Sequence, residues 1–462
     1  MEADTIFAVA SGAGHAAIAV VRISGPASFA ALAALCGRVP PPRRASLRNL
    51  RDRDGAELDQ AMVVWLPGPG SYTGEDSVEL FLHGGRAVLD GVAQALVRFG
   101  ARPAEAGEFT RRAFLNGKMD LTEAEAVHDL VAAETTAQRR QALRQLDGAL
   151  GTIYRGWADR LRVLLAQQEA LIDFPDEDLP PEIEAAVLAE LAALGEEVAV
   201  HLDDERRGER LREGLVFAVT GRPNVGKSSL VNALAERDVA IVSAMPGTTR
   251  DALETRVVLG GVPVTLVDTA GLRASTDAIE AEGVRRALAR AADADLVVVV
   301  IEPGEQAGEQ EAPPPLAGGE GAAPVPARPP RPNSLPQGEG EYVVAASHLL
   351  VMNKLDLGSV APVDAIGVSA LTGEGLDTLR ARLGAAARSL TESAGPPPLT
   401  QARHRAALQE AAARLADARI ADLAELRAED LRLALRALGR ITGSVGVEDI
   451  LDTLFSRFCI GK

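Results

Sequence analysis

Cysteine is almost absent from this chain of 462 residues, which holds only Cys36 and Cys459. Neither residue belongs to a C-x-x-C or C-x-x-H pattern, so no disulfide framework and no structural zinc site can be read from the sequence. So few cysteines also favour a reducing compartment.

Long hydrophobic runs and a basic N-terminus are missing as well. The longest aliphatic run, Leu296–Ile301, is far shorter than the roughly 20 residues that a membrane-spanning helix needs. The first residues, MEADTIFAVASGAGH, are acidic where a secretory signal peptide would be basic. We therefore expect a cytoplasmic protein without a membrane anchor.

Positive charge is also in deficit, because 65 acidic residues against 48 lysines and arginines give a formal net charge of −17 at pH 7. A surface of this sign disfavours indiscriminate binding to nucleic acid. A nucleic-acid partner would have to meet a local basic patch or be handed over by another protein.

The length predicts about three domains, at roughly 100–200 residues for each. Residues 1–118 mix short β-type runs with one helical segment and predict an α+β domain. Residues 119–213 and 389–462 have helical periodicity, whereas residues 214–388 alternate strands with helices, as a parallel α/β domain does. The simplest arrangement is one helical domain in two separated parts, with the α/β domain inserted between them.

Two local patterns refine this division. Thr122 and Glu125 have the spacing of a capping box and predict the start of a helix. Residues 302–341 hold ten Pro, seven Gly and seven Glu, which predicts a disordered insertion. The alternative for the stretch ARPPRP within it is a polyproline ligand for an SH3-like partner.

The segment GRPNVGKS, Gly221–Ser228, matches the phosphate-binding pattern G-x-x-x-x-G-K-[ST] between a predicted strand and a predicted helix. Its glycines let backbone N–H groups point at phosphate oxygens. Lys227 would reach the β- and γ-phosphates, and Ser228 would hold Mg²⁺. The sequence therefore predicts a nucleoside triphosphate site.

The segment NKLD, Asn353–Asp356, selects the base. The Asp356 carboxylate can accept hydrogen bonds from the N1–H and the exocyclic amine of guanine, a pair of donors that adenine lacks. SAL, Ser369–Leu371, lies where backbone contacts to the base are expected. These segments predict a GTPase and argue strongly against an ATP-dependent kinase.

The segment DTAG, Asp268–Gly271, ends a predicted strand. Asp268 would orient Mg²⁺ through water, and Gly271 would let the backbone approach the γ-phosphate. Many small GTPases carry a glutamine next to orient the attacking water, but Leu272 stands there and cannot do so. Catalysis therefore needs a group other than a glutamine at this position.

The segment SAMPGTTRD, Ser243–Asp251, could supply this group by binding cations. Thr249 suits Mg²⁺, and the preceding loop is rich in carbonyls that could surround a monovalent cation, to which Asn224 could add an oxygen. A K⁺ ion held against the phosphates would supply positive charge where other GTPases use an arginine finger.

These motifs, together with VRISG, SYTGED, LNGKMDLTEAEAV, DFPDED and the final FCIGK, resemble the MnmE (TrmE) family of tRNA modification GTPases over nearly the whole chain. The resemblance implies a homodimer that works with the flavoprotein MnmG in a heterotetramer or larger complex, and G domains that dimerise around K⁺. It also implies modification of carbon 5 of the wobble uridine of certain tRNAs, with a methylene group taken from a tetrahydrofolate. The alternative is a regulatory GTPase switch in ribosome assembly, which folate binding would distinguish.

The resemblance also implies ligands for the cations and a residue that positions the attacking water. The K⁺ ligands would be Asn224, Ser243, the Met245 carbonyl and Thr248, and the Mg²⁺ ligands Ser228 and Thr249. Glu280, with Lys227, would be catalytic, although Glu282 is close enough to leave that assignment open. The other positions assigned to GTP and its cations are Val225, Gly226, Ser229, Ala244, Pro246, Gly247, Asp268, Thr269, Ala270, Gly271, Asn353, Lys354, Asp356, Ser369, Ala370 and Leu371.

The family binds a folate in its N-terminal domain, either 5-formyl- or 5,10-methylene-tetrahydrofolate. The matching positions here are Arg22, Glu79, Lys118 and Lys462. A pterin presents the same N–H and amine edge as guanine, so a carboxylate such as Glu79 suits it, while the basic residues suit an anionic tail or a formyl oxygen. Without the resemblance, Arg22 and Lys118 would be surface charges and Glu79 a solvent-facing strand residue.

The last segment, Val447–Phe458, has the pattern of an amphipathic helix that would dock and carry the final four residues to a defined place. Its predicted buried face holds Ile450, Leu451, Leu454 and Phe458. Cys459 would then be a candidate nucleophile or proton donor at the folate site. The alternative is that Cys459 fills a gap in the core and that Lys462 is solvated.

Overall fold

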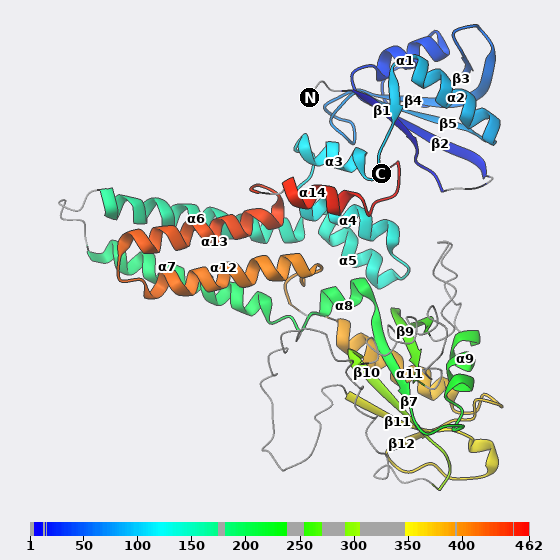
Figure 1. Ribbon diagram of the computed structural model, residues 1–462, viewed down its shortest axis with the longest axis vertical. Helices are drawn as coiled ribbons and strands as arrows, with labels where there is room; N and C mark the ends of the chain where they lie inside the picture. Colours follow the sequence, from blue (N-terminus) through cyan, green and yellow to red (C-terminus); the bar gives the residue numbers. More distant parts are fainter. Residues whose placement is uncertain are drawn as a thin grey trace, which may run out of the picture. The chain divides into compact units, whose positions relative to one another are not determined.

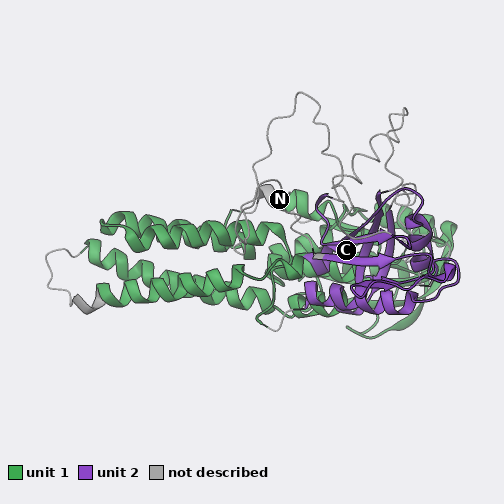
Figure 2. Cartoon of the chain, turned by 90° about the horizontal axis from the view of Figure 1, so that it is seen from below, with its two compact units in different colours: residues 1–133, 138–209, 393–462 green, residues 134–137, 210–392 purple. Residues whose placement is uncertain are grey.

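The structure is a computed structural model that describes residues 4–12, 14, 16–173, 181–237, 254–269, 292–304, 347–392, 395–446 and 448–461. The chain forms two compact units (Figure 2). Unit 1 comprises Met1–Ala133, Gln138–Glu209 and Ser393–Lys462, and unit 2 comprises Glu134–Ala137 and Arg210–Glu392. Unit 1 thus holds both the N-terminal and the helical parts of the chain, and it is interrupted by unit 2 as the sequence predicted.

The N-terminal part of unit 1 is built on a six-stranded sheet in the order β3-β4-β5-β2-β1-β6 (Figure 1). Neighbouring strands are antiparallel, except that β1 and β6 are parallel. The strands are β1 (Thr5–Val9), β2 (Ala16–Ser24), β3 (Ser46–Arg51), β4 (Glu57–Leu66), β5 (Ser77–Gly84) and β6 (Ala101–Pro103). Helices α1 (Ser28–Cys36), α2 (Arg86–Arg98) and α3 (Glu108–Leu115) accompany them. The predicted α+β architecture is confirmed.

The two faces of this sheet differ because successive side chains of a strand point to opposite sides. Val21 and Ile23 of β2 are buried in a core that includes Leu32 of α1 and Leu96 of α2. Arg22, between them, therefore lies on the other face. That face carries a second, smaller cluster formed by Ile6, Ala8, Ala104 and Phe109, with Tyr72 packed against it.

The helical part of unit 1 brings together segments that are far apart in the sequence. Helices α6 and α7 precede unit 2, helices α12 and α13 follow it, and all four share one core that includes Tyr154, Leu194, Leu408 and Leu438 (Figure 1). The helices are α4 (Leu121–Ala132), α5 (Thr136–Leu146), α6 (Ala149–Asp173), α7 (Pro181–Leu202), α12 (Ala402–Ile420), α13 (Ala424–Thr442) and α14 (Glu448–Phe455), and α8 (Arg207–Glu213) begins in unit 1 and ends in unit 2. A helical domain in two separated parts is thus what the chain forms.

The predicted capping box at the start of α4 is wrong. Asp120, not Thr122, caps the helix: its side chain accepts a hydrogen bond from the backbone N–H of Glu123, whose side chain in turn accepts one from the backbone N–H of Asp120, at 2.9 and 2.8 Å. Thr122 is already the second helical residue and is fully buried. The acidic residue that the cap requires is therefore Glu123, which leaves Glu125 for another partner.

Glu125 instead joins the two parts of the helical domain. Its carboxylate, only 1 % exposed, accepts hydrogen bonds from Arg403 Nε at 2.5 Å and from His404 Nε2 at 2.8 Å. Burial raises the pKa of Glu125, but the nearby charges of Arg403 and His404 outweigh burial and hold that pKa at about 2. A charge buried at this depth needs such partners, so this contact fixes α12 against α4.

Unit 2 is a six-stranded sheet in the order β12-β11-β10-β7-β9-β8, parallel except for β8. Its strands are β7 (Leu215–Thr220), β8 (Glu254–Leu259), β9 (Val262–Asp268), β10 (Leu296–Ile301), β11 (Ser347–Met352) and β12 (Ala365–Gly367). Helices α9 (Lys227–Arg237) and α11 (Leu376–Thr391) pack on the sheet through residues such as Leu230 and Leu379. This is the predicted parallel α/β domain.

Most of the Pro-rich segment, residues 305–341, lies outside the described residues, so its predicted disorder stays a prediction. Glu302, at its start, is described and accepts a hydrogen bond from Lys354 Nζ at 2.7 Å. Within the described ranges, no helix is long and apolar enough to cross a membrane.

Candidate functional site

The phosphate-binding loop lies between the end of β7 and the start of α9, as its motif predicts. Gly221 and Gly226 have φ angles of +144° and +93°, which favour glycine. Both also lie in tight places: an added Cβ would be 2.2 Å from the Val300 carbonyl oxygen at Gly221, and 2.2 Å from Asn353 Nδ2 at Gly226. The loop can therefore follow this path only with glycine at these two positions.

Lys227, the first residue of α9, is 4 % exposed and lies across this loop. Its ammonium donates hydrogen bonds to the carbonyl oxygens of Gly221 and Arg222, both at 2.8 Å. Burial lowers the pKa of Lys227, against the opposing charge of Asp268. The ammonium and the N-terminal N–H groups of α9 thus converge on the loop, where together they favour bound phosphate.

The two described candidates for Mg²⁺ binding are in contact. Ser228 Oγ donates a hydrogen bond to Oδ2 of Asp268, the last residue of β9. Thr269 Oγ1 donates to the Val219 carbonyl oxygen at 2.9 Å and ties this segment to β7. A hydroxyl and a carboxylate suit Mg²⁺, which takes hard oxygen ligands and normally completes its shell with water and phosphate oxygens.

Asn353 connects the phosphate loop to the base-reading segment, a role that the sequence analysis missed. Its side chain is 3 % exposed. Nδ2 donates to the Val225 carbonyl oxygen at 2.9 Å, and Oδ1 accepts from the Ala370 N–H at 3.1 Å. One amide thus positions both parts of the candidate nucleotide site. Its place at the head of NKLD was the available signal.

Asp356 is exposed, and one of its two carboxylate oxygens is held by a hydrogen bond. Its Oδ1 accepts a hydrogen bond at 2.5 Å from the fully buried Ser369 hydroxyl. That hydroxyl oxygen also accepts from the backbone N–H of Thr372 at 3.1 Å. The SAL segment therefore orients the carboxylate that was predicted to read guanine. Leu371, in the same segment, is 85 % exposed.

Several predicted residues of this site lie outside the described residues. Asn224, one predicted K⁺ ligand, is described; it is exposed, at a φ of +68°. The K⁺ ligands, the second Mg²⁺ ligand and the water-positioning glutamate otherwise stay predictions. The predicted residues of this site without a description are Ser243, Ala244, Met245, Pro246, Gly247, Thr248, Thr249, Ala270, Gly271 and Glu280, and Lys462 of the predicted folate site is not described either.

A second candidate site lies on the face of the N-terminal sheet opposite α1 and α2. In the strand register, Arg22 of β2 is paired with Ala8 of β1 and with Glu79 of β5. Arg22 Nε and Nη2 both donate to Glu79 Oε1, at 3.1 and 2.9 Å. The side chains are 19 % and 22 % exposed, so two of the predicted folate ligands form a pair that solvent can reach.

Lys118, a third predicted folate ligand, lies against the loop that joins β4 and β5. Its ammonium donates to the Pro69 carbonyl oxygen at 2.8 Å. A Cβ added at Gly74 would lie 3.3 Å from Lys118 Cδ. The same loop carries Tyr72, whose ring lies beside Arg22.

Helix α14 docks on α4, as its amphipathic pattern predicted, but it ends earlier. Leu451, Phe455 and Phe458 are buried in one cluster with Leu121 and Ala124 of α4. Of the predicted buried face, Leu451 and Phe458 are confirmed and Leu454 is partly buried, whereas the side chain of Ile450 lies outside the described residues. Phe455, which the pattern analysis omitted, is the last helical residue.

The residues after α14 lie against the N-terminal domain. Ile460 forms an antiparallel bridge with Ala106. Gly461 has a φ of +97° and approaches β1 so closely that an added Cβ would be 2.4 Å from the Val9 carbonyl oxygen. The thiol of Cys459 is exposed, so the alternative in which it fills a gap in the core is wrong. The tail therefore ends one strand away from Arg22.

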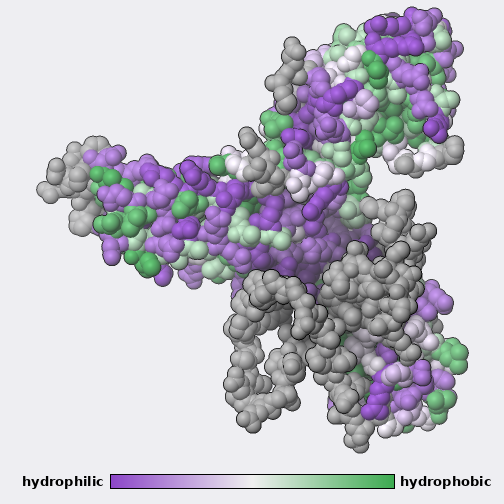
Figure 3. Space-filling model, in the orientation of Figure 1, coloured by the Kyte–Doolittle hydropathy of each residue, from purple (hydrophilic) through white to green (hydrophobic). Residues whose placement is uncertain are grey.

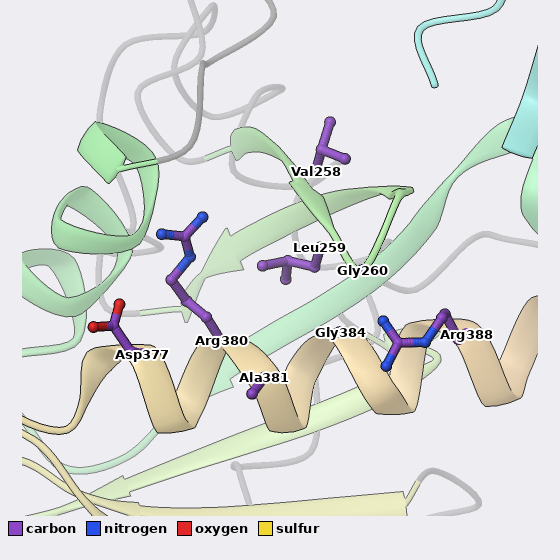
Figure 4. A pocket seen from close by; sticks show the side chains of 8 residues that line it. All are labelled: Val258, Leu259, Gly260, Asp377, Arg380, Ala381, Gly384 and Arg388. Carbon is purple, nitrogen blue, oxygen red and sulfur yellow. The ribbon is translucent and has the colours of Figure 1, made fainter. Parts of the chain in front are cut away.

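A separate hollow of about 400 Å³ lies in unit 2, between the β8–β9 hairpin and α11 (Figure 4). The side chain of Arg380 extends away from Arg388, so the two cations do not converge on one ligand. The lining consists of Val258, Leu259, Gly260, Asp377, Arg380, Ala381, Gly384 and Arg388. It includes no residue of the phosphate loop, and it is not a candidate nucleotide site.

Comparison with known proteins gives matches over most of the chain. Residues 5–118 match the family described as GTP-binding protein TrmE N-terminus, and residues 121–459 match the MnmE helical domain. The tRNA modification GTPase MnmE of Gluconacetobacter diazotrophicus is 58 % identical, over 99 % of this chain and 98 % of its own length. The protein of the same name from Granulibacter bethesdensis is 56 % identical, over the full length of both.

Among solved structures, the G-domain of FeoB from Methanococcus jannaschii covers 38 % of this chain and 98 % of its own length. Its sequence identity is 20 % and its TM-score is 0.22, which is too low to support a conclusion about the fold.

Proposed function

We propose that this chain, which belongs to the MnmE family of tRNA modification GTPases, uses a tetrahydrofolate one-carbon unit to modify carbon 5 of a wobble uridine. In this proposal it acts as a homodimer with the flavoprotein MnmG, on tRNA, and its GTP hydrolysis is activated by K⁺. Membership of the family already establishes a GTP hydrolase that acts in tRNA modification. The folate, the cation and the partners are the proposal.

For GTP hydrolysis, the proposal gives each described side chain a distinct task. Lys227 and the N-terminus of α9 would bind the phosphates, Ser228 would hold Mg²⁺ together with Thr249, Asp268 would orient the ion through water, and Asp356 would read the guanine. Mg²⁺ would neutralise charge that develops on the phosphate oxygens. Leu272 cannot orient a water, and a K⁺ ion bound by Asn224 and the loop Ser243–Thr248 would supply the remaining positive charge.

The observation that supports the folate proposal is that Arg22 of β2 pairs with Glu79 of β5, while the last described residues of the chain pack against β1, the neighbour of β2. Both Arg22 donors use Glu79 Oε1, and Glu79 Oε2 accepts no hydrogen bond from any residue that the structure describes. That oxygen is free to accept from the N–H and amine edge of a pterin. Bound there, the folate would supply the one-carbon unit beside Cys459 and the tail.

Exposed hydrophobic residues of the N-terminal domain support homodimer formation. Figure 3 shows such residues gathered at its surface. Ile18, Leu47 and Met62 are 60 %, 55 % and 41 % exposed. Leu47 pairs with Met62 across β3 and β4, so their side chains lie on the same face of the sheet. Exposed apolar residues on one face favour burial against another protein, and a second copy of the domain would bury them.

Glu79→Gln is expected to weaken the binding of 5-formyl-tetrahydrofolate by about tenfold or more, because an amide both loses the charge and presents a donor to the pterin amine. Titration calorimetry on the purified full-length chain measures this directly. Glu57→Gln, at an exposed carboxylate on β4, is the matched control and should bind as the wild type does. A wild-type chain that binds no folate would reject this half of the proposal and favour the regulatory switch.

Replacing K⁺ by Na⁺ at equal ionic strength is expected to lower kcat for GTP hydrolysis by about tenfold or more, because the smaller ion fits a ring of oxygens built for K⁺ poorly and stabilises the transition state less. Initial rates in KCl and in NaCl at saturating GTP measure the effect. Equal rates in the two salts would show that hydrolysis uses no K⁺ site.

A further inference from the structure

We infer that Tyr72 is a positioning residue of the proposed folate site: it holds the Arg22 guanidinium so that Arg22 engages only one oxygen of Glu79. The inference rests on the proposed function and assigns a task to a residue of the β4–β5 loop that forms no hydrogen bond with Glu79 or with the described residues of the tail.

The Arg22 guanidinium lies close to two aromatic rings and one carboxylate. Its Cζ is 5.3 Å from the centroid of the Tyr72 ring and 5.8 Å from that of Phe109. Both distances are within the roughly 6 Å at which a cation is attracted to a ring face. Phe109 is fully buried in the small cluster on this face, with Tyr72 packed against it, so the two packed rings restrict where the guanidinium can lie.

Tyr72 is itself held in place through its hydroxyl. The oxygen is 2.8 Å from Thr110 Oγ1, and Thr110 is fully buried on α3. Burial raises the pKa of Tyr72, against the opposing charge of Arg22, so the hydroxyl stays protonated and neutral near pH 7. The Tyr72 ring is therefore fixed relative to α3, and Arg22 is fixed relative to the ring.

Helix α3 is held in turn by the end of the chain. Gly107, at its N-cap, has a φ of +68°, and an added Cβ there would lie 2.6 Å from the Phe455 carbonyl oxygen. The backbone N–H of Gly107 donates to the Cys459 carbonyl oxygen at 3.5 Å. Tail, α3, Tyr72 and Arg22 thus form one continuous series of contacts.

The consequence of this positioning concerns Glu79. An unrestrained guanidinium beside a carboxylate tends to form two parallel hydrogen bonds, one to each oxygen. Here Arg22 directs both donors at Oε1. The one-sided pair keeps the Glu79 carboxylate oriented while Oε2 stays available to the pterin, whereas a two-sided pair would occupy both oxygens.

The test is the affinity of the full-length chain for 5-formyl-tetrahydrofolate. Tyr72→Leu, which removes ring and hydroxyl, should weaken binding about tenfold, whereas Tyr72→Phe, which keeps the ring, should restore affinity to within about threefold of wild type. Phe29→Leu is the matched control, because Phe29 is a partly exposed aromatic of the same domain that contacts Trp65. All three variants should hydrolyse GTP at the wild-type rate.

A double-mutant cycle separates positioning from a general loss of packing. If Tyr72 acts through Arg22, the loss caused by Tyr72→Leu should nearly vanish in an Arg22→Met chain. Equal losses in both backgrounds would overturn the inference, and so would a Tyr72→Leu chain with wild-type affinity. Tyr72→Leu could lower the melting temperature by more than a few degrees. In that case the cycle uses Tyr72→Met instead, because methionine keeps much of the buried volume.

The two levels of the proposal fail in different ways. A wild-type chain that binds no folate rejects the proposed function itself. A wild-type chain that binds folate, with an affinity that no Tyr72 substitution changes, rejects only the role given to Tyr72.

Discussion

A chain that ends at Phe458 is expected to hydrolyse GTP at the wild-type rate, while tRNA modification with the flavoprotein partner falls to background. The residues removed contact the N-terminal domain, through Ala106, Gly107 and Val9. They belong to unit 1, whereas the phosphate loop belongs to unit 2. Modified uridine in digested tRNA and phosphate release, measured on the same preparation, check the two halves of this expectation.

Point substitutions narrow the cause of that loss. Gly461→Ala should lower modification strongly, because its Cβ would meet the Val9 carbonyl oxygen at a φ that disfavours any side chain. Cys459→Ser keeps the backbone contacts and tests the thiol alone. Wild-type modification by Cys459→Ser would leave the tail a purely positional role, and wild-type modification by the truncated chain would contradict a role for the tail altogether.

Asn353→Ala is expected to weaken GTP binding about a hundredfold. The substitution leaves the buried Val225 carbonyl and the half-buried Ala370 N–H without their partner. Each unpaired group costs about 1–3 kcal/mol, and each 1.4 kcal/mol corresponds to a tenfold change in affinity. Displacement of a fluorescent GTP analogue measures the loss.

The control for this experiment is Asn353→Asp, which keeps the acceptor for Ala370 but places a carboxylate against the Val225 carbonyl oxygen. Its affinity should be lower than that of the wild type and depend on pH, recovering when the carboxyl is protonated. Folate binding, which depends on unit 1, should be the same in all three chains. A loss of GTP affinity smaller than about threefold for Asn353→Ala would show that the two segments hold their positions without this amide.

The sequence predicted best what depends on contiguous residues. The phosphate loop follows from eight consecutive residues, and its glycines are required by local backbone angles and close contacts. Arg22 and Glu79 were both identified by resemblance, but their pairing was not, because it depends on the register of two strands whose residues are 57 positions apart.

The misses have the same physical origin. The spacing of Thr122 and Glu125 fits a capping box, but Asp120 and Glu123 fit it equally well two residues earlier, and only the burial of Thr122 decides between them. The true partners of Glu125 are 278 and 279 positions away, beyond the reach of any local pattern. The task of Asn353 was missed for the same reason, since it joins segments 128 positions apart.

The divided helical bundle described above sets an order for folding during synthesis. Helices α6 and α7 leave the ribosome before unit 2, but their apolar residues are buried against α12 and α13, which are made only after it. Domains generally fold as units while the chain grows, so the contiguous G domain can close while the bundle is still half open. Glu125 stays without Arg403 and His404 throughout that interval. A translation product that stops within α12 would therefore carry a folded GTPase on an exposed, aggregation-prone pair of helices.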